Sequence, residues 1–422
     1  MRLKSWAIGK ARKAVRTKTG IKVRNALGLT QTPSGNHELD AVPIPGQIVV
    51  YFSDVSTKAY QLRQWLPVLE RLHQERPVLL VFRKVATMRH FADLTTLPKI
   101  YVRRLEDLVT LYDANDFSLC LYVNNGVANF QSLSSSRLVH VHINHGESDK
   151  LSMVSNQAKA YDYVMIAGNA ALERHRAVLM DFDERRLLPV GRPQLDVDYA
   201  SILPAFEGRT VMYAPTWEGE NSANNYTSMD LYGAQVIERL LAEPATRVIY
   251  KPHPRIRNST DAGVKNAHLS ILASLEEANA HGGEHVVALT EDILALFGDV
   301  DALVADVSSV GLDFLYLRPE RPLILTDRRN DREAMNRDAP ISGACPVIDG
   351  QPGNDVVELL IELIDQDAFK EQRLAMREHY FGQRDKGEST AEFIRAIGEL
   401  IDGRRAQLVG HPYYANAVES AD

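Results

Sequence analysis

Short apolar runs alternate with amphipathic segments along most of the chain. Six runs of β-branched, aliphatic or aromatic residues, each bounded by polar or turn residues, predict strands. They lie at residues 47–52, 77–82, 100–103, 119–123, 138–143 and 163–166. Amphipathic stretches between them, such as 59–74 and 105–112, predict helices. Strands that are apolar throughout and separated by helices are typical of a parallel sheet covered on both faces.

A second series of the same kind begins near residue 210. Its predicted strands lie at residues 211–213, 248–250, 285–288, 302–305 and 323–325. Its predicted helices lie at residues 230–241, 263–280, 292–297 and 310–317. The pattern therefore predicts an α/β protein with two tandem Rossmann-like domains and a cleft between them. Two more predicted helices, 356–364 and 390–401, close the chain, and by analogy with other two-lobed folds we expect them to pack back on the first lobe.

Domain boundaries follow from this pattern and from the length of 422 residues, which is more than one hydrophobic core usually organises. We expect an arm and linker at 1–46, a first Rossmann-like domain at 47–190, a second at 191–390, and a C-terminal helix and tail at 391–422. The segment 188–193 contains two prolines and a glycine, which predicts the hinge between the two domains.

Charge is distributed unevenly along the chain. Residues 1–30 carry nine lysines or arginines and no acid, so removing them from the net charge of −7 leaves the remainder near −16. Such an acidic body disfavours nucleic acid as a partner, whereas the basic arm suits an anionic membrane surface. The alternative is a solvated, frayed N-terminus.

Several functional classes are disfavoured. No apolar run reaches the length of a membrane span, and the N-terminus lacks the apolar core of a signal peptide. Cys120 and Cys345 are too few for a disulfide framework or a zinc site. Neither a G-x-G-x-x-G fingerprint after the first strand nor a P-loop is present. We therefore expect a cytoplasmic protein without a cofactor or metal, held peripherally on the inner face of the cell membrane.

Four polar clusters directly follow predicted strands, where open α/β sheets bind their ligands. They are Asn144-His145-Gly146, the run from Tyr213 to Trp217 that contains Thr216, the run from Lys251 to Arg255 that contains His253, and Asp306-Val307-Ser308-Ser309. Because the clusters come from both predicted domains, they could converge on one cleft.

Each cluster has a chemical and a structural interpretation. An imidazole such as that of His145 takes up a proton near neutral pH, although a structural histidine remains open. Lys251, His253 and Arg255 bring cationic or proton-bearing groups to one rigid loop, which suits a phosphate-rich ligand. The serines at 308 and 309 suit an anion site at a helix N-terminus or simple helix capping. His140 and His142 alternate within a predicted strand and are interpreted as sheet residues.

The order His-Gly, Tyr-Ala-Pro-Thr-Trp, Lys-Pro-His-Pro and Asp-x-Ser-Ser resembles the CDP-glycerol glycerophosphotransferases, the family of teichoic-acid primases and polymerases. The resemblance covers residues 135–390 and includes Asp385-Lys386-Gly387 with Ser389. It implies the glycosyltransferase-B architecture, with an acceptor domain first and a nucleotide-donor domain second. It also implies His145 as general base, His253 as a group acting at the phosphate or leaving group, and a donor site formed by Thr216, Lys251, Arg255, Asp306, Ser308 and Ser309.

The sequence departs from the family pattern at three points. Asn144 stands where the family usually has tryptophan, and Glu147-Ser148-Asp149-Lys150 stands where it has Thr-Pro-Leu-Lys. Glu218 replaces an arginine that often follows the Tyr-Ala-Pro-Thr-Trp run. The donor therefore stays open between CDP-glycerol, CDP-ribitol and another CDP-alditol or sugar, and the acceptor is expected to be a lipid-linked or polymer hydroxyl. The alternatives are a nucleotide-sugar glycosyltransferase of a surface polysaccharide and a non-catalytic membrane-associated assembly factor.

Overall fold

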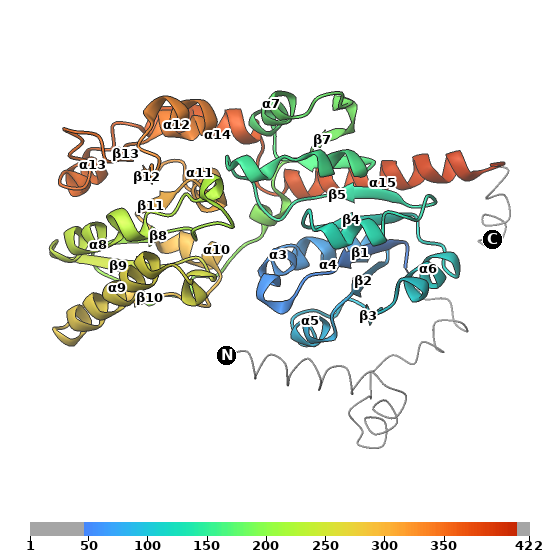
Figure 1. Ribbon diagram of the computed structural model, residues 1–422, viewed down its shortest axis with the longest axis horizontal. Helices are drawn as coiled ribbons and strands as arrows, with labels where there is room; N and C mark the ends of the chain where they lie inside the picture. The colour runs from blue at the N-terminus through green and yellow to red at the C-terminus, as the bar shows by residue number, and fades with distance from the viewer. Residues whose placement is uncertain (1–45, 412–422) are drawn as a thin grey trace, which may run out of the picture.

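The computed structural model describes residues 46–411 and contains two parallel sheets, each flanked by helices (Figure 1). The predicted basic arm and the tail beyond residue 411 lie outside the described residues. The α/β class and the two tandem sheets that the sequence predicts are confirmed. Among the helices within residues 46–411, none combines the length and the apolar character needed to cross a bilayer.

The first sheet has seven parallel strands in the order β3-β2-β1-β4-β5-β6-β7. Their bounds are β1 Ile48–Phe52, β2 Val78–Phe82, β3 Lys99–Tyr101, β4 Leu119–Tyr122, β5 Val139–His142, β6 Tyr163–Ile166 and β7 Leu187–Pro189. The strand order reverses between β1 and β4, because β1 pairs with β2 on one side and with β4 on the other; Ile48 is in register with Val78 and Leu119. A ligand of such a sheet binds beyond the carboxyl ends of the strands at this reversal.

Helices cover both faces of the first sheet. They are α3 Tyr60–Arg63, α4 Leu66–Glu75, α5 Val85–His90, α6 Leu105–Asp113 and α7 Asn169–Val178. Val50 and its neighbours on one face pack against α4, whereas Val49 and Tyr51 on the other face pack against α6. Because both faces are buried, the central strands are apolar throughout, as the sequence pattern indicates.

The second sheet repeats this topology with six parallel strands in the order β10-β9-β8-β11-β12-β13. Their bounds are β8 Arg209–Ala214, β9 Thr246–Tyr250, β10 Val286–Val287, β11 Ala302–Asp306, β12 Leu323–Thr326 and β13 Val347–Ile348. The associated helices are α8 Ala234–Leu241, α9 Ala262–Ala280, α10 Ile293–Leu296, α11 Ser309–Leu317, α12 Arg332–Asp338, α13 Leu360–Gln366 and α14 Lys370–Phe381. Here the order reverses between β8 and β11.

The last helix, α15 (Glu388–Leu408), returns to the first sheet and lies beside β5 (Figure 1). Phe393, Ile397 and Ile401 are fully buried in the same apolar cluster as β1 and α4. The rings of Phe393 and Trp65 lie 5.2 Å apart, centroid to centroid. The first core is therefore built from both ends of the described chain. The expectation that the helix predicted at 356–364 also packs on the first lobe is wrong, because Leu360, Ile361 and Ile364 of α13 lie in the core of the second sheet.

The first part of the segment predicted as the hinge, 188–193, belongs to a strand instead. Leu187–Pro189 forms β7, which pairs in parallel with β6 at the edge of the sheet. Proline is tolerated on an edge strand because no neighbour requires its missing amide hydrogen. The turn that follows is tightly packed: a side chain at Gly191, whose φ is +79°, would meet the Ser389 hydroxyl at 2.2 Å.

Candidate functional site

Loops from both sheets meet where the carboxyl ends of the strands face each other. Gly146, after β5, lies so close to α11 that a Cβ atom at this position would be 3.1 Å from the Ser309 Cβ. Lys150, four residues later, donates a hydrogen bond from Nζ to the Thr216 hydroxyl after β8, at 2.8 Å. The residues around these contacts are called the junction site here: Tyr60, His145, Lys150, Thr216, Lys251, His253, Arg255, Ser308 and Ser309.

His145 is held by its neighbours in the loop after β5. Asn144 adopts the left-handed conformation, with a φ of 54°, which asparagine tolerates better than most residues. Its carbonyl oxygen accepts a hydrogen bond from the Trp65 indole at 2.5 Å. Together with the tight contact of Gly146, this fixes the backbone on both sides of the histidine.

The two predicted histidines both contact one aromatic ring. Tyr60, at the start of α3, contacts both His145 and His253 edge to face, and each pair of ring centroids is 6.0 Å apart. His253 also stacks on Trp217, and the Arg255 guanidinium lies over the same indole, 4.0 Å from its centroid. The structure thus brings together residues that lie more than 100 positions apart in the sequence.

Both histidines are neutral at physiological pH. Burial lowers the pKa of His145 to about 4, and the positive charge of Arg192 contributes to this shift. Burial, followed by the charges of Lys150 and Arg255, lowers the pKa of His253 to about 3. The His253 Nδ1 accepts a hydrogen bond from the Arg255 amide at 3.2 Å, so its proton resides on Nε2. His145 can therefore accept a proton, and His253 can donate a hydrogen bond to an anion.

Lys150 belongs to the site although the sequence analysis did not select it. Burial lowers its pKa to about 8, and the nearby carboxylate of Asp306 opposes this shift. Its Nζ lies 5.6 Å from the centroid of the Tyr226 ring. The available signal was its position: Lys150 follows His145 at the same spacing as the lysine of the family pattern.

The other predicted residues line the same region in different roles. Lys251 is buried, and burial lowers its pKa. Asp306 is fully buried, and its carboxylate accepts hydrogen bonds from the Thr216 amide at 2.6 Å and the Thr326 hydroxyl at 2.7 Å. This geometry suits positioning of Thr216 better than direct contact with a phosphate. Ser308 caps α11 by accepting a hydrogen bond from the Val310 amide at 3.3 Å, and Ser309 begins the helix.

A buried ionic cluster holds the loop between His145 and Lys150. Arg174, on α7, donates to Glu147 at 2.5 Å and also to Asp149, while the Tyr380 hydroxyl on α14 donates to the other oxygen of Asp149. Burial raises the pKa of Asp149 to about 6, against the opposing charge of Arg174. These four residues are called the loop clamp here. Its acids stand where the family pattern has Thr-Pro-Leu.

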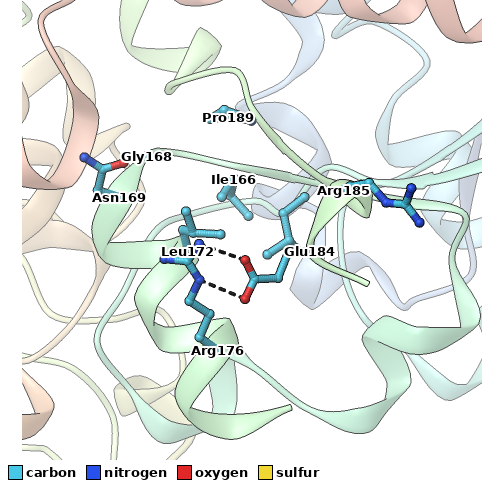
Figure 2. Close-up of a pocket in the computed structure, with 9 residues that line it drawn as sticks. Ile166, Gly168, Asn169, Leu172, Arg176, Glu184, Arg185 and Pro189 are labelled. Atoms are coloured by element: carbon cyan, nitrogen blue, oxygen red, sulfur yellow. Dashed lines mark hydrogen bonds and ion pairs between the residues drawn. The ribbon is translucent and has the colours of Figure 1, made fainter. Parts of the chain in front are cut away.

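A pocket of about 310 Å³ lies elsewhere, at the edge of the first sheet (Figure 2). Its lining includes Ile166, Leu172 and the ion pair between Arg176 and Glu184, which Figure 2 shows as a wall of the pocket. None of the predicted site residues lines it. Within residues 46–411, no three histidine, cysteine, aspartate or glutamate side chains are grouped as metal ligands.

Comparison with known families settles the relationship. The pattern of the CDP-glycerol:poly(glycerophosphate) glycerophosphotransferases matches residues 116–398, which is more than half of the chain. The chain belongs to this family. The resemblance inferred from the motifs is thereby confirmed, and the family is one of transferases. No curated protein matches the chain.

Solved structures share the fold of this family member. The wall teichoic acid polymerase TagF is 16% identical with a TM-score of 0.55, and the match covers 95% of this chain and 99% of that chain. A histidine-to-asparagine variant of TagF soaked with CDPG is 18% identical with a TM-score of 0.58 and the same coverage. A putative UDP-N-acetylglucosamine 2-epimerase from Listeria monocytogenes is 14% identical with a TM-score of 0.58, covering 84% of this chain and 96% of that chain. These likenesses confirm the glycosyltransferase-B architecture.

Proposed function

We propose that this chain transfers glycerol phosphate, or a related alditol phosphate, from a CDP-alditol to a hydroxyl of a membrane-linked acceptor in the synthesis of a teichoic-acid-like or capsular polymer. The observation that carries the proposal is the arrangement of two neutral histidines from different sheets around Tyr60, beside Lys150 and Arg255. The first sheet would bind the acceptor and the second the nucleotide. A TagF variant soaked with CDPG supports the choice of donor.

In the proposed reaction, the acceptor oxygen attacks the distal phosphorus of the CDP-alditol while His145 takes the hydroxyl proton. A new P–O bond forms as the bond from phosphorus to CMP breaks, and CMP leaves with the electron pair. Lys150, Lys251 and Arg255 stabilise the charge that develops on the phosphates, and the His253 Nε2–H donates to the same oxygens. The neutral state of His145 lets it act without prior deprotonation.

A donor panel tests the activity. Purified protein is incubated with a membrane fraction and CDP-glycerol, CDP-ribitol or UDP- and CMP-sugars, and the released nucleotide is followed. CMP release from a CDP-alditol supports the proposal. Turnover of a nucleotide sugar alone would instead indicate a surface-polysaccharide glycosyltransferase, and no turnover at all, with intact binding of polymer, would indicate an assembly factor.

The variant His145→Ala tests the assignment of the base. Transfer should fall by about two orders of magnitude or more, while donor affinity changes little, because the base acts on the acceptor. His281→Ala serves as the matched control, since His281 is exposed at the end of α9, and it should retain full activity. Normal turnover in the His145 variant would exclude this role.

A further inference from the structure

The carboxyl ends of four strands in the first sheet form an exposed surface that combines cations with apolar side chains. It is called the strand-end surface here and consists of Val55 after β1, Arg83 and Lys84 after β2, Arg103 to Leu105 after β3, and Val127 to Phe130 after β4. Val127 is 73% exposed and Phe130 46% exposed, within a single short helix. Val55 and Leu105 are also exposed.

Hydrogen bonds tie these loops into one continuous face. Arg83 donates to the carbonyl oxygens of Arg103 and Arg104 at 3.2 and 3.1 Å, and to the Gln131 amide oxygen at 2.9 Å. The Thr87 hydroxyl donates to the Asp54 carbonyl at 2.9 Å, which joins α5 to the loop after β1. The exposed groups therefore lie on one held surface rather than on independent loops.

Two cations of this surface are available to bind an anionic partner. Lys84 and Arg103 are exposed and have no side-chain hydrogen bond or ion pair within residues 46–411. Two of the acids in these loops are paired, Asp54 with Lys58 at 3.2 Å and Asp107 with Arg104 at 2.7 Å, whereas Glu106 is exposed. Exposed cations beside exposed apolar side chains suit an anionic lipid surface, which offers negative head groups above an apolar interior.

We propose that the strand-end surface rests on an anionic membrane and presents the junction site to its lipid-linked acceptor. The surface begins in the loop that borders the candidate base, because Asp54 and Lys58 are among the charges that act on His145. Membrane contact here would bring a hydroxyl on a lipid-linked chain to the site without a long passage through water. The orientation rests on the proposed function, whereas the membrane contact does not.

Tryptophan at position 130 reports the contact directly. In the full chain, Phe130→Trp should show a blue-shifted emission with vesicles of phosphatidylglycerol and phosphatidylcholine, and brominated lipids should quench it. Leu269→Trp is the matched control, because Leu269 is 53% exposed on α9; in both variants the emission of the parent chain, which has three tryptophans, is subtracted, and the emission of the tryptophan at 269 should not change. An unchanged Phe130→Trp spectrum would overturn the proposal, whether the chain sediments with vesicles or not. The same spectral change with soluble polyphosphate in place of vesicles would also overturn it.

Neutralising the cations tests the electrostatic part. Lys84→Gln combined with Arg103→Gln should lower vesicle partitioning by about thirtyfold, or roughly fivefold per cation. Lys265→Gln with Lys370→Gln removes two exposed cations from α9 and α14 that have no ion pair among the described residues, and should leave partitioning unchanged. An equal decrease in vesicle partitioning for both double variants would overturn the assignment of membrane binding to the strand-end surface. CMP release in a vesicle-free assay with a soluble acceptor tests the proposed function separately, since membrane contact requires no turnover.

Discussion

Among the residues of the junction site, Lys150 is a lysine whose pKa is lowered by burial into the range of ordinary assay conditions. An exposed lysine stays charged far above physiological pH, but the pKa of Lys150 is lowered to about 8. Its ammonium group reaches across from the first sheet to Thr216 on the second. The charge that this residue offers to a donor phosphate therefore depends on pH in the range where the enzyme would be assayed.

The lowered pKa of Lys150 predicts that donor affinity decreases at alkaline pH, which gives the pH profile of donor binding an alkaline limb. Because Lys150 is charged only below its pKa, donor affinity should fall as pH rises through about 8. Lys150→Arg should keep the affinity and move the limb above pH 10, since arginine stays protonated there. Lys150→Met should weaken binding about tenfold at pH 7 and abolish the limb. Calorimetric titrations of CDP-glycerol from pH 6.5 to 9.5 measure this, and a flat wild-type profile would contradict it.

Substitutions in the predicted donor site should also weaken donor binding. Lys251→Ala, and separately Ser308→Ala with Ser309→Ala, should each weaken donor affinity by about tenfold or more, because each removes hydrogen bonds to phosphate. Loss of the Ser308 cap also destabilises α11 by about 1 kcal/mol, so folding must be checked by thermal unfolding. Unchanged donor dissociation constants in folded variants would leave these residues with structural roles only.

At the scale of single residues, the sequence predicted a site at the strand ends because parallel strands present their carboxyl ends at one edge. His145 and His253 could be selected in this way. Their contacts with Tyr60 could not be predicted, because the sequence pattern indicates only one amphipathic helix at 59–74 and gives no reason to select Tyr60 from it. Asp306 looked like a ligand because nothing in the sequence reveals that Thr216 and Thr326 already engage its carboxylate.

At the scale of structural elements, the loop clamp holds the conformation of the loop after β5. Arg174 neutralises Glu147 and Asp149 in a buried setting, and α7 and α14 supply its other members. The two acids therefore act as positioning residues for the backbone that carries His145 and Lys150.

The clamp predicts a large and repairable loss of stability. Arg174→Met leaves two buried carboxylates without a cation and should lower the free energy of unfolding by about 3–5 kcal/mol. Adding Glu147→Gln and Asp149→Asn to this variant should recover most of the loss, because no buried charge is then left unpaired. Urea denaturation of the wild type and of both variants measures this. A triple variant no more stable than the single one would show that the charges are not the cause.

Two of the shortest strands were not predicted. β7 has three residues and β13 two, too few to show a clear periodic pattern. β3 and β10 are equally short, but they overlap the predicted strands 100–103 and 285–288. The long apolar runs at β1, β8 and β11 were found because both faces of each strand are buried. The proline and glycine signals near residue 190 did mark the passage between the sheets, although β7 occupies the first part of the segment.

For the whole molecule, the buried histidines predict sensitivity to acid. The pKa values of His142, His145 and His253 are lowered to about 3, 4 and 3 from 6.5, so below pH 6.5 the unfolded chain binds protons that the folded chain does not. Stability should therefore fall as pH falls from 6.5 toward 4. Burial raises the pKa of Asp149 to about 6 and also raises the pKa values of Asp306 and Asp313, which acts in the opposite direction. Burial likewise lowers the pKa values of four further histidines, which adds to the sensitivity to acid: His140, His175, His268 and His285.

The size of this effect can be bounded from His142, which is fully buried. Its contribution alone should cost about 2 kcal/mol between pH 6.5 and pH 5. Urea unfolding at pH 7.5 and pH 5 should show a lower midpoint at the acidic pH. The variant His142→Gln, which cannot titrate, should show a smaller difference, and equal midpoints for the wild type at both pH values would refute the account.

The return of α15 to the first sheet has a consequence for synthesis on the ribosome. The nascent first sheet emerges with the face that Phe393, Ile397 and Ile401 will cover still open to water, and about two hundred residues must be translated before the covering helix exists. The second sheet can meanwhile fold on its own core. The half made first is thus the half completed last, and during that interval it is the part of the chain most in need of a chaperone.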